Sequence, residues 1–87
     1  MKNLERKLKA LANKRRLDIL KAIKQERDNE LSVGEIAERI RLSFKATSRH
    51  LSILTGADIL EKEQRGLQVF YRLSYNDRLI KYVFSII

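Results

Sequence analysis

Basic and small hydroxyl side chains fall on one face of a predicted helix spanning residues 43–55. At about 100° per residue, that face carries Lys45, Ser48, Arg49 and Ser52, with Ala46 at its edge. Arginine can donate two hydrogen bonds to guanine O6 and N7, and serine can donate to a base edge or to a phosphate. No acidic residue occurs from Leu42 to Ala57. The face therefore predicts a recognition helix for the major groove of DNA, and the alternative is an ordinary solvated helix face.

The opposite side of the same helix, and the helix before it, position this face. Ser43 is an N-cap candidate, and the buried stripe falls at Thr47, Leu51 and Leu54. Upstream, Ser32 and Glu35 have the spacing of a capping box, so a short helix is expected to begin there. Its buried side consists of Val33, Ile36, Ala37 and Ile40. Residues 32–55 are thus predicted to form a helix-turn-helix.

Two more helices are predicted ahead of this unit, and a β-hairpin behind it. Residues 3–12 have the pattern of an amphipathic helix, and Asn13 is expected to end it and to cap the next helix, at residues 15–24. Gly56 is expected to end the 43–55 helix in a left-handed conformation. Residues 59–63 and 68–73, separated by the turn-like residues 64–67, predict the hairpin, because apolar residues alternate in its second half.

The last predicted helix, residues 76–87, has more apolar surface than one core contact requires. Asn76 is its expected N-cap. Its apolar arc of about 200° is roughly twice the width of one core-facing stripe, which implies a second partner. The alternative is a terminal helix sunk into its own core. A single domain of 87 residues buries only about 60% of its unfolded surface, so a partner subunit would add stability.

The charge of the chain favours a polyanionic partner. Nineteen Lys and Arg residues against eleven Asp and Glu residues give a net charge of +8. Neutralising phosphates with such a surface releases counterions and drives binding. Ten of the basic residues, against three acidic ones, lie within residues 1–27.

Composition also argues against several other classes of protein. The chain has no cysteine and a single histidine, so neither a disulfide nor a conventional transition-metal site is expected, and no cofactor motif is found. No ordered nucleophile, base and oxyanion donor can be assembled, so we do not expect an enzyme. The apolar C-terminal run is short and interrupted by Arg78 and Lys81, and residues 2–9 are charged, so we expect neither a membrane protein nor a secreted one, but a cytoplasmic protein.

Four segments, taken together and in order, resemble the ArsR/SmtB family of winged helix-turn-helix repressors. They are Ala10–Asn13 with Arg16–Leu17 and Ile19–Leu20, then Glu30–Ile36, then Leu42–Ser43 with Ser48–Leu51, and finally Gly66 with Tyr71 and Leu73. The resemblance implies one mainly α (α+β) domain over residues 1–87, with the hairpin at 59–73 as the wing. It also implies a dimer formed through the helices at 3–12 and 76–87.

The resemblance extends to single residues. His50 belongs to a Ser-Arg-His-Leu motif and is interpreted as a packing or phosphate-contacting residue. In the family, the residue after the wing glycine is often an arginine that reaches toward the minor groove or its phosphates. This chain has Leu67 there, so the resemblance assigns that contact to the neighbouring Arg65, with help from Lys62. The alternative is that Arg65 is a solvated turn residue. The dimerisation set is Leu4, Leu8, Leu11, Leu79, Tyr82, Val83, Ile86 and Ile87. The DNA-binding set is Ser43, Lys45, Ala46, Ser48, Arg49, His50, Ser52, Lys62 and Arg65.

Familiar metal-ligand positions of the family are not occupied by its usual ligands. The positions of its cysteine pair hold Ser32 and Gly34, and the last helix offers only Asp77. A regulator that does not sense metal is therefore expected. We predict a homodimeric, sequence-specific repressor that binds an inverted repeat of double-stranded DNA. Two alternatives stay open: a winged-helix module that binds another protein, and a chromatin-like binder indifferent to DNA sequence.

Overall fold

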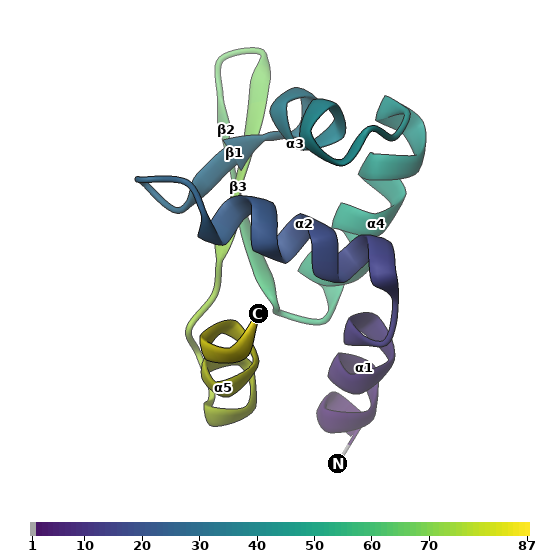
Figure 1. The fold of residues 1–87 in the computed structure, drawn as a ribbon, viewed down its shortest axis with the longest axis vertical. Coiled ribbons are helices and arrows are strands. Elements are labelled where there is room, and N and C mark those ends of the chain that lie inside the picture. Colours follow the sequence, from purple (N-terminus) through teal and green to yellow (C-terminus); the bar gives the residue numbers. More distant parts are fainter. Residues whose placement is uncertain (1) are drawn as a thin grey trace.

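The computed structural model describes the backbone of residues 2–87 and the side chains from Leu4 onward, as helices packed beside a small sheet (Figure 1). The elements are α1 (Lys2–Leu11), α2 (Lys14–Lys24), β1 (Glu30–Ser32), α3 (Val33–Ile40), α4 (Phe44–Gly56), β2 (Leu60–Arg65), β3 (Gln68–Leu73) and α5 (Arg78–Ile86). The predicted helix-turn-helix is α3 with α4, and the predicted hairpin is β2 with β3. The mainly α fold with a β-hairpin is confirmed.

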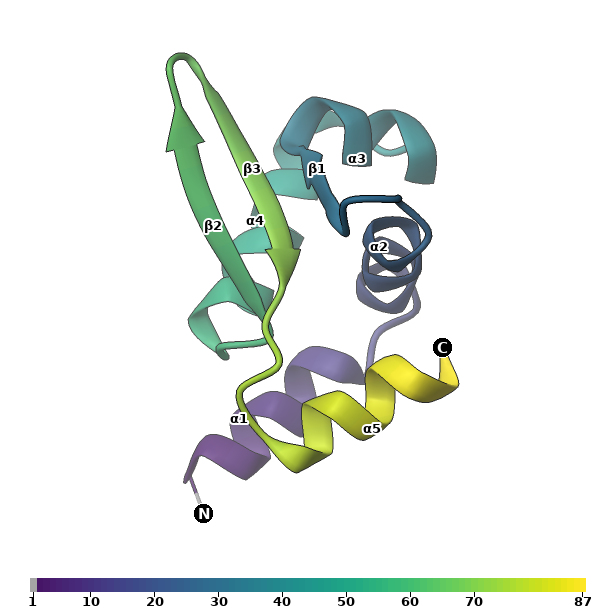
Figure 2. The same ribbon diagram turned by 90° about the vertical axis from the view of Figure 1, so that its left-hand side faces the viewer.

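The sheet is antiparallel, with strand order β1-β3-β2. Tyr71 in the central strand β3 faces Leu31 on one side and Lys62 on the other. β2 extends to Arg65, two residues beyond the prediction, so the turn is only Gly66 and Leu67. Gly66 has a φ of +63°, which glycine adopts without a Cβ clash. The hairpin projects away from the helices as a wing (Figure 2).

The hydrophobic core forms around α2, which contributes the fully buried Ile19, Leu20 and Ile23. Side chains from the other elements close around them; those buried to 2% exposure or less include Leu31, Ile36, Leu51, Leu54, Ile59, Leu60, Ile80 and Phe84. The three inward positions predicted for α4 are thus buried, Thr47 among them. Burial of this stripe fixes the rotation of α4 and therefore determines which of its side chains face outward.

Side-chain caps begin the helices at sharply defined residues. The capping box is present: Ser32 Oγ accepts from the Glu35 N–H at 3.2 Å, and Glu35 Oε1 accepts from the Ser32 N–H at 2.8 Å. Ser43 and Asn13 cap α4 and α2 as predicted. The prediction of Asn76 as a cap is wrong, because α5 begins at Arg78 and Asp77 accepts from the Ile80 N–H at 2.9 Å.

The helix-turn-helix elements both end on a left-handed residue that is not glycine. After α4, that residue is Asp58, with a φ of +60°, and the Ile59 N–H donates to the Leu54 carbonyl at 3.0 Å. The predicted left-handed cap at Gly56 is therefore wrong, because the helix continues through Gly56. After α3, Arg41 has a φ of +56°.

Replacing Arg41 with glycine is expected to stabilise the protein by about 1 kcal/mol, because a side chain in the left-handed region costs about 1–2 kcal/mol and glycine avoids that cost. The measurement is the urea midpoint of unfolding. Glu38→Gly, inside α3, is the matched control, and its free energy of unfolding should fall by about 1 kcal/mol. A lower midpoint for Arg41→Gly than for the wild type would show that the strain is not there.

Candidate nucleic-acid interface

The outward face of α4 is free of covering chain. Lys45, Arg49 and Ser52 are exposed, while Ser48 and Ala46 are half-buried at the edges of the face. Ser43 is also exposed, and its hydroxyl accepts from the Ala46 N–H at 3.1 Å, so its first role is to begin the helix. The structure therefore brings together the predicted residues of α4 on one exposed face, and their contact with DNA stays a prediction.

His50 lies at the border between this face and α2. Its Nδ1 atom is 3.3 Å from Nη1 of Arg16, and it can accept from that arginine only while it is unprotonated. Burial lowers the pKa of His50, and the positive charges of Arg16, Arg15 and Arg49 lower it further. The lowered pKa favours the neutral imidazole, which links α4 to α2 through Arg16, and a contact of His50 with a phosphate stays a prediction.

The free energy of unfolding is expected to decrease as the pH falls below about 6.5, the ordinary value for histidine. The lowered pKa of His50 means that the unfolded chain binds the proton more readily than the folded one, so stability is greater at higher pH. In His50→Gln the decrease between pH 7.5 and 5.5 should be smaller, as measured by urea midpoints at fixed protein concentration. An equal decrease in the variant would rule His50 out as the titrating group.

The wing carries an ion-pair network that sequence reasoning did not predict. Arg65 Nη2 donates to Oε1 of Glu30 and to Oε1 of Glu63, at 2.9 Å each, and its guanidinium lies 4.6 Å from the centre of the Phe70 ring. Arg72 pairs with Glu61 and Glu63 across the same face of the sheet. The two arginines lower the pKa of Glu63. Arg65 is therefore the last residue of β2, exposed and with its charge paired, and its contact with DNA stays a prediction.

The rest of the wing offers a cation and an apolar tip. Lys62 is exposed, as its predicted role requires, and the apolar residue Leu67 at the tip is fully exposed. Phe44, at the first turn of α4, is also 61% exposed. Leu67 and Phe44 line a hollow of about 270 Å³, together with residues 32–34 before and within α3 and residues 68–69 of β3.

The predicted dimerisation residues lie on α1 and α5, which sit at the same end of the molecule in both views (Figures 1 and 2). Lys7 and Asp77 form an ion pair between the two helices. The most exposed apolar residues there are Leu4, Leu8, Tyr82 and Ile86, at 40%, 49%, 64% and 63%. Leu79, Val83 and Ile87 are half-buried. Leu11 is only 8% exposed and belongs to the core of its own chain, so its assignment to a partner contact is corrected.

Within the part of the chain that the structure describes, no group of three or more His, Cys, Asp or Glu side chains is placed to hold a metal ion. Ser32 and Asp77, which stand at the family's ligand positions, are the N-caps of α3 and α5. Among the described helices, none has both the length and the apolar character needed to cross a membrane.

Known proteins are similar to this chain in sequence and in fold. The family model described as "Bacterial regulatory protein, arsR family" matches residues 13–62. The transcriptional activator HlyU of Vibrio cholerae is 46% identical over 67 residues, which is 77% of this chain and 59% of HlyU. The arsenical resistance operon repressor of Bacillus subtilis is 31% identical over 74 residues, 85% of this chain and 69% of the repressor. The chain thus spans about three fifths of the length of the first of these relatives.

A solved structure supports the same assignment. The homodimeric winged helix-turn-helix DNA-binding domain Mb0332 of Mycobacterium bovis, described as a possible ArsR-family regulator, superposes with a TM-score of 0.82 at 28% identity, covering 98% of this chain and 74% of that one. The matched segment contains the helix-turn-helix and its outward face. The chain belongs to the ArsR family of bacterial regulatory proteins.

Proposed function

We propose that the protein is a homodimeric transcriptional regulator that binds double-stranded DNA sequence-specifically by inserting α4 into the major groove. The observation that carries this proposal is that one face of α4 is buried and the opposite face is exposed and basic. Thr47, Leu51 and Leu54 are buried, and the opposite face exposes Lys45, Arg49 and Ser52 with no acidic residue from 42 to 57. A charged, open helix face on a rigid core suits a groove walled by phosphates.

The dimer is proposed from the apolar end of the molecule. Leu4, Leu8, Tyr82 and Ile86 are exposed on adjoining helices, and such a cluster is unfavourable in water unless a partner covers it. A second copy is the occupant that we favour, because the Mycobacterium bovis domain of the same fold is homodimeric. A two-fold dimer would present two copies of α4 about 34 Å apart, so its site should be an inverted repeat.

The regulatory outcome that we propose is repression by occlusion of a promoter, in the cytoplasm and without a bound metal. The relatives include one described as an activator and one described as a repressor. We favour repression because a small dimer that covers one turn of the groove on each half-site blocks other proteins by its presence alone. An activator would need a further surface to recruit polymerase.

Selection of bound fragments from random DNA tests this function. The proposal predicts enrichment of one motif with two-fold symmetry and half-sites one helical turn apart. Enrichment without a motif would identify a sequence-indifferent binder. Absence of any salt-sensitive binding would identify a module whose partner is a protein.

Replacing Lys45 with alanine is expected to flatten the dependence of DNA affinity on salt. The side chain is exposed at the first turns of α4, where it can reach a phosphate, and each lost contact lowers the slope of log K against log salt by about 0.9. Fluorescence anisotropy at several salt concentrations measures the slope, with Lys24→Ala, on an exposed part of α2, as control. An unchanged slope in Lys45→Ala would exclude a phosphate contact.

A further inference from the structure

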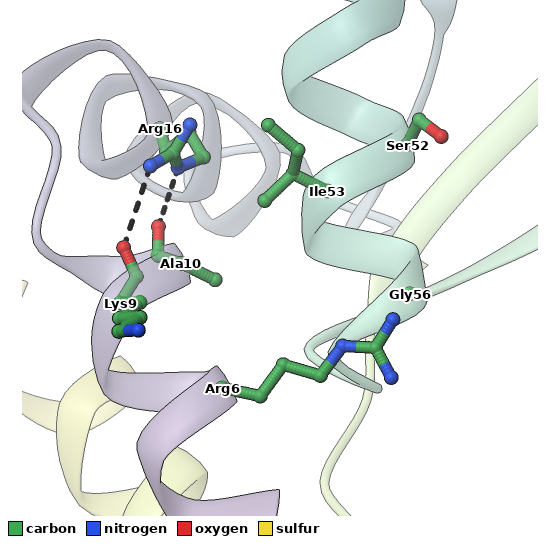
Figure 3. A pocket seen from close by; sticks show the side chains of 7 residues that line it. All are labelled: Arg6, Lys9, Ala10, Arg16, Ser52, Ile53 and Gly56. Atoms are coloured by element: carbon green, nitrogen blue, oxygen red, sulfur yellow. Dashed lines mark hydrogen bonds between the residues drawn. The ribbon is translucent and has the colours of Figure 1, made fainter.

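A basic hollow of about 390 Å³ lies between α1, α2 and the C-terminal half of α4 (Figure 3). Its lining includes Arg6 and Lys9 from α1, Arg16 from α2, and Ser52 and Ile53 from α4. Figure 3 shows the guanidinium groups of Arg6 and Arg16 on different sides of the hollow, with Ile53 projecting between α4 and Arg16. The described residues that line it include three cations and no carboxylate.

The guanidinium of Arg16 is held by neutral acceptors, and that of Arg6 lies beside the last turn of α4. Arg16 Nε donates to the Ala10 carbonyl at 2.6 Å and Nη2 to the Lys9 carbonyl at 3.3 Å, both neutral acceptors. Arg6 approaches the last turn of α4 so closely that a Cβ on Gly56 would lie 3.5 Å from its Nη2 atom. Among the side chains that the structure describes, no carboxylate pairs with either arginine. The hollow therefore has a positive potential that a bound anion would balance.

Lys9 contributes less to this potential than the arginines do. Its Nζ atom is 3.0 Å from Oε1 of Glu5, in an exposed pair on the outer side of α1. The effect of the positive charges is also felt by His50, since Arg16 is one of the groups that lower its pKa. The cations of the hollow that no described carboxylate neutralises are thus Arg6 and Arg16, and Ser52 belongs to the same lining.

We propose that this hollow binds a phosphate group. The expected source of this phosphate is the backbone of DNA bound by α4. With DNA as the source, the inference rests on the proposed function. Ser52 belongs both to the exposed face of α4 and to the lining of the hollow, which makes the two surfaces continuous. A phosphate that flanks the base contacts would meet Arg6 next, and the second source of the same group is a free phosphorylated ligand.

The position of the contacted phosphate along the DNA follows from the placement of α1. Leu4 and Leu8 are on the opposite side of α1 from Arg6, so the proposed dimer contact and the hollow do not compete for the same face. Because α1 stands between α4 and the proposed two-fold axis, Arg6 should contact the backbone in the segment between the two half-sites. Each dimer would make this contact twice.

The test compares Arg6→Gln with Arg27→Gln, a matched change at an exposed loop residue away from the hollow. Arg6→Gln is expected to weaken binding to the selected DNA about tenfold, similarly on specific and random sequences, and to lower the salt slope by about 0.9 per protomer. Phosphate ethylation should interfere with wild-type binding between the half-sites, and this interference should disappear in Arg6→Gln. Equal melting temperatures of the two variants would show that both are folded.

A second arm uses inorganic phosphate without DNA, followed by the NMR shifts of the arginine side-chain N–H groups. Saturable shifts at Arg6 in the wild type, absent in Arg6→Gln, would support the phosphate site with a free ligand as its source, even if DNA binding were unchanged. The inference is overturned if Arg6→Gln binds DNA as Arg27→Gln does and inorganic phosphate produces no saturable shift. If the wild type binds no DNA, the proposed function fails and the phosphate titration alone decides this inference.

Discussion

Replacing Arg49 with alanine is expected to weaken binding to the selected inverted repeat by about 1–3 kcal/mol per half-site and to relax the choice of base at one position. Arg49 is exposed in the middle of the outward face of α4, between Lys45 and Ser52, where the side chain is best placed to reach a base edge. A guanidinium that forks onto guanine O6 and N7 provides discrimination that no phosphate contact supplies. Anisotropy titrations with the repeat and with each single-base variant measure both effects.

Arg49→Lys separates the charge of this residue from its geometry. Lysine retains the positive charge but lacks the planar fork, so binding to random DNA should be retained while discrimination at the guanine is reduced. If Arg49→Ala weakened binding equally on the repeat and on random DNA, Arg49 would be a phosphate contact, and base recognition would have to lie elsewhere on α4.

Replacing Ile86 with aspartate is expected to produce a monomer that binds the inverted repeat about 10²–10⁴-fold more weakly than the wild type. Ile86 is 63% exposed on α5, beside the exposed Tyr82, and a carboxylate buried there in a dimer would be unpaired. Without the dimer, the second half-site is no longer bound at a high effective concentration. Sedimentation equilibrium and anisotropy measure the mass and the affinity of the same samples.

Leu67→Asp is the matched control for the mass measurement, since Leu67 is equally apolar and fully exposed but lies at the wing tip, away from α1 and α5. It should retain the dimeric mass. A dimeric Ile86→Asp with wild-type affinity would show that the apolar surface of α5 does not form the contact between subunits.

Local signals explain why the helix-turn-helix could be predicted in detail. The capping box of Ser32 and Glu35 involves residues three apart, and the buried stripe of α4 follows from helical periodicity alone. One error arose where two neighbouring residues had similar propensities. Asn76 and Asp77 can both cap a helix, and the choice is made by the burial of Ile80 and Phe84, which sets where α5 begins.

Contacts between distant segments explain what the sequence could not show. Arg65 pairs with Glu30, 35 residues away, because β1 and β2 flank the same central strand. Leu11 looked like its neighbours Leu4 and Leu8 in periodicity, yet it is buried because α1 meets the rest of the core at its C-terminal end. The basic hollow joins Arg6 and Arg16, whose proximity depends on the packing of α1, α2 and α4.

Protection of guanine N7 from methylation on the selected DNA tests most directly whether α4 enters the major groove twice. N7 lies in that groove, so a bound dimer should protect two patches on one face of the duplex, about one helical turn apart. Arg49→Ala should lose protection at one guanine in each patch. Protection of a single patch, or of minor-groove atoms alone, would contradict the account.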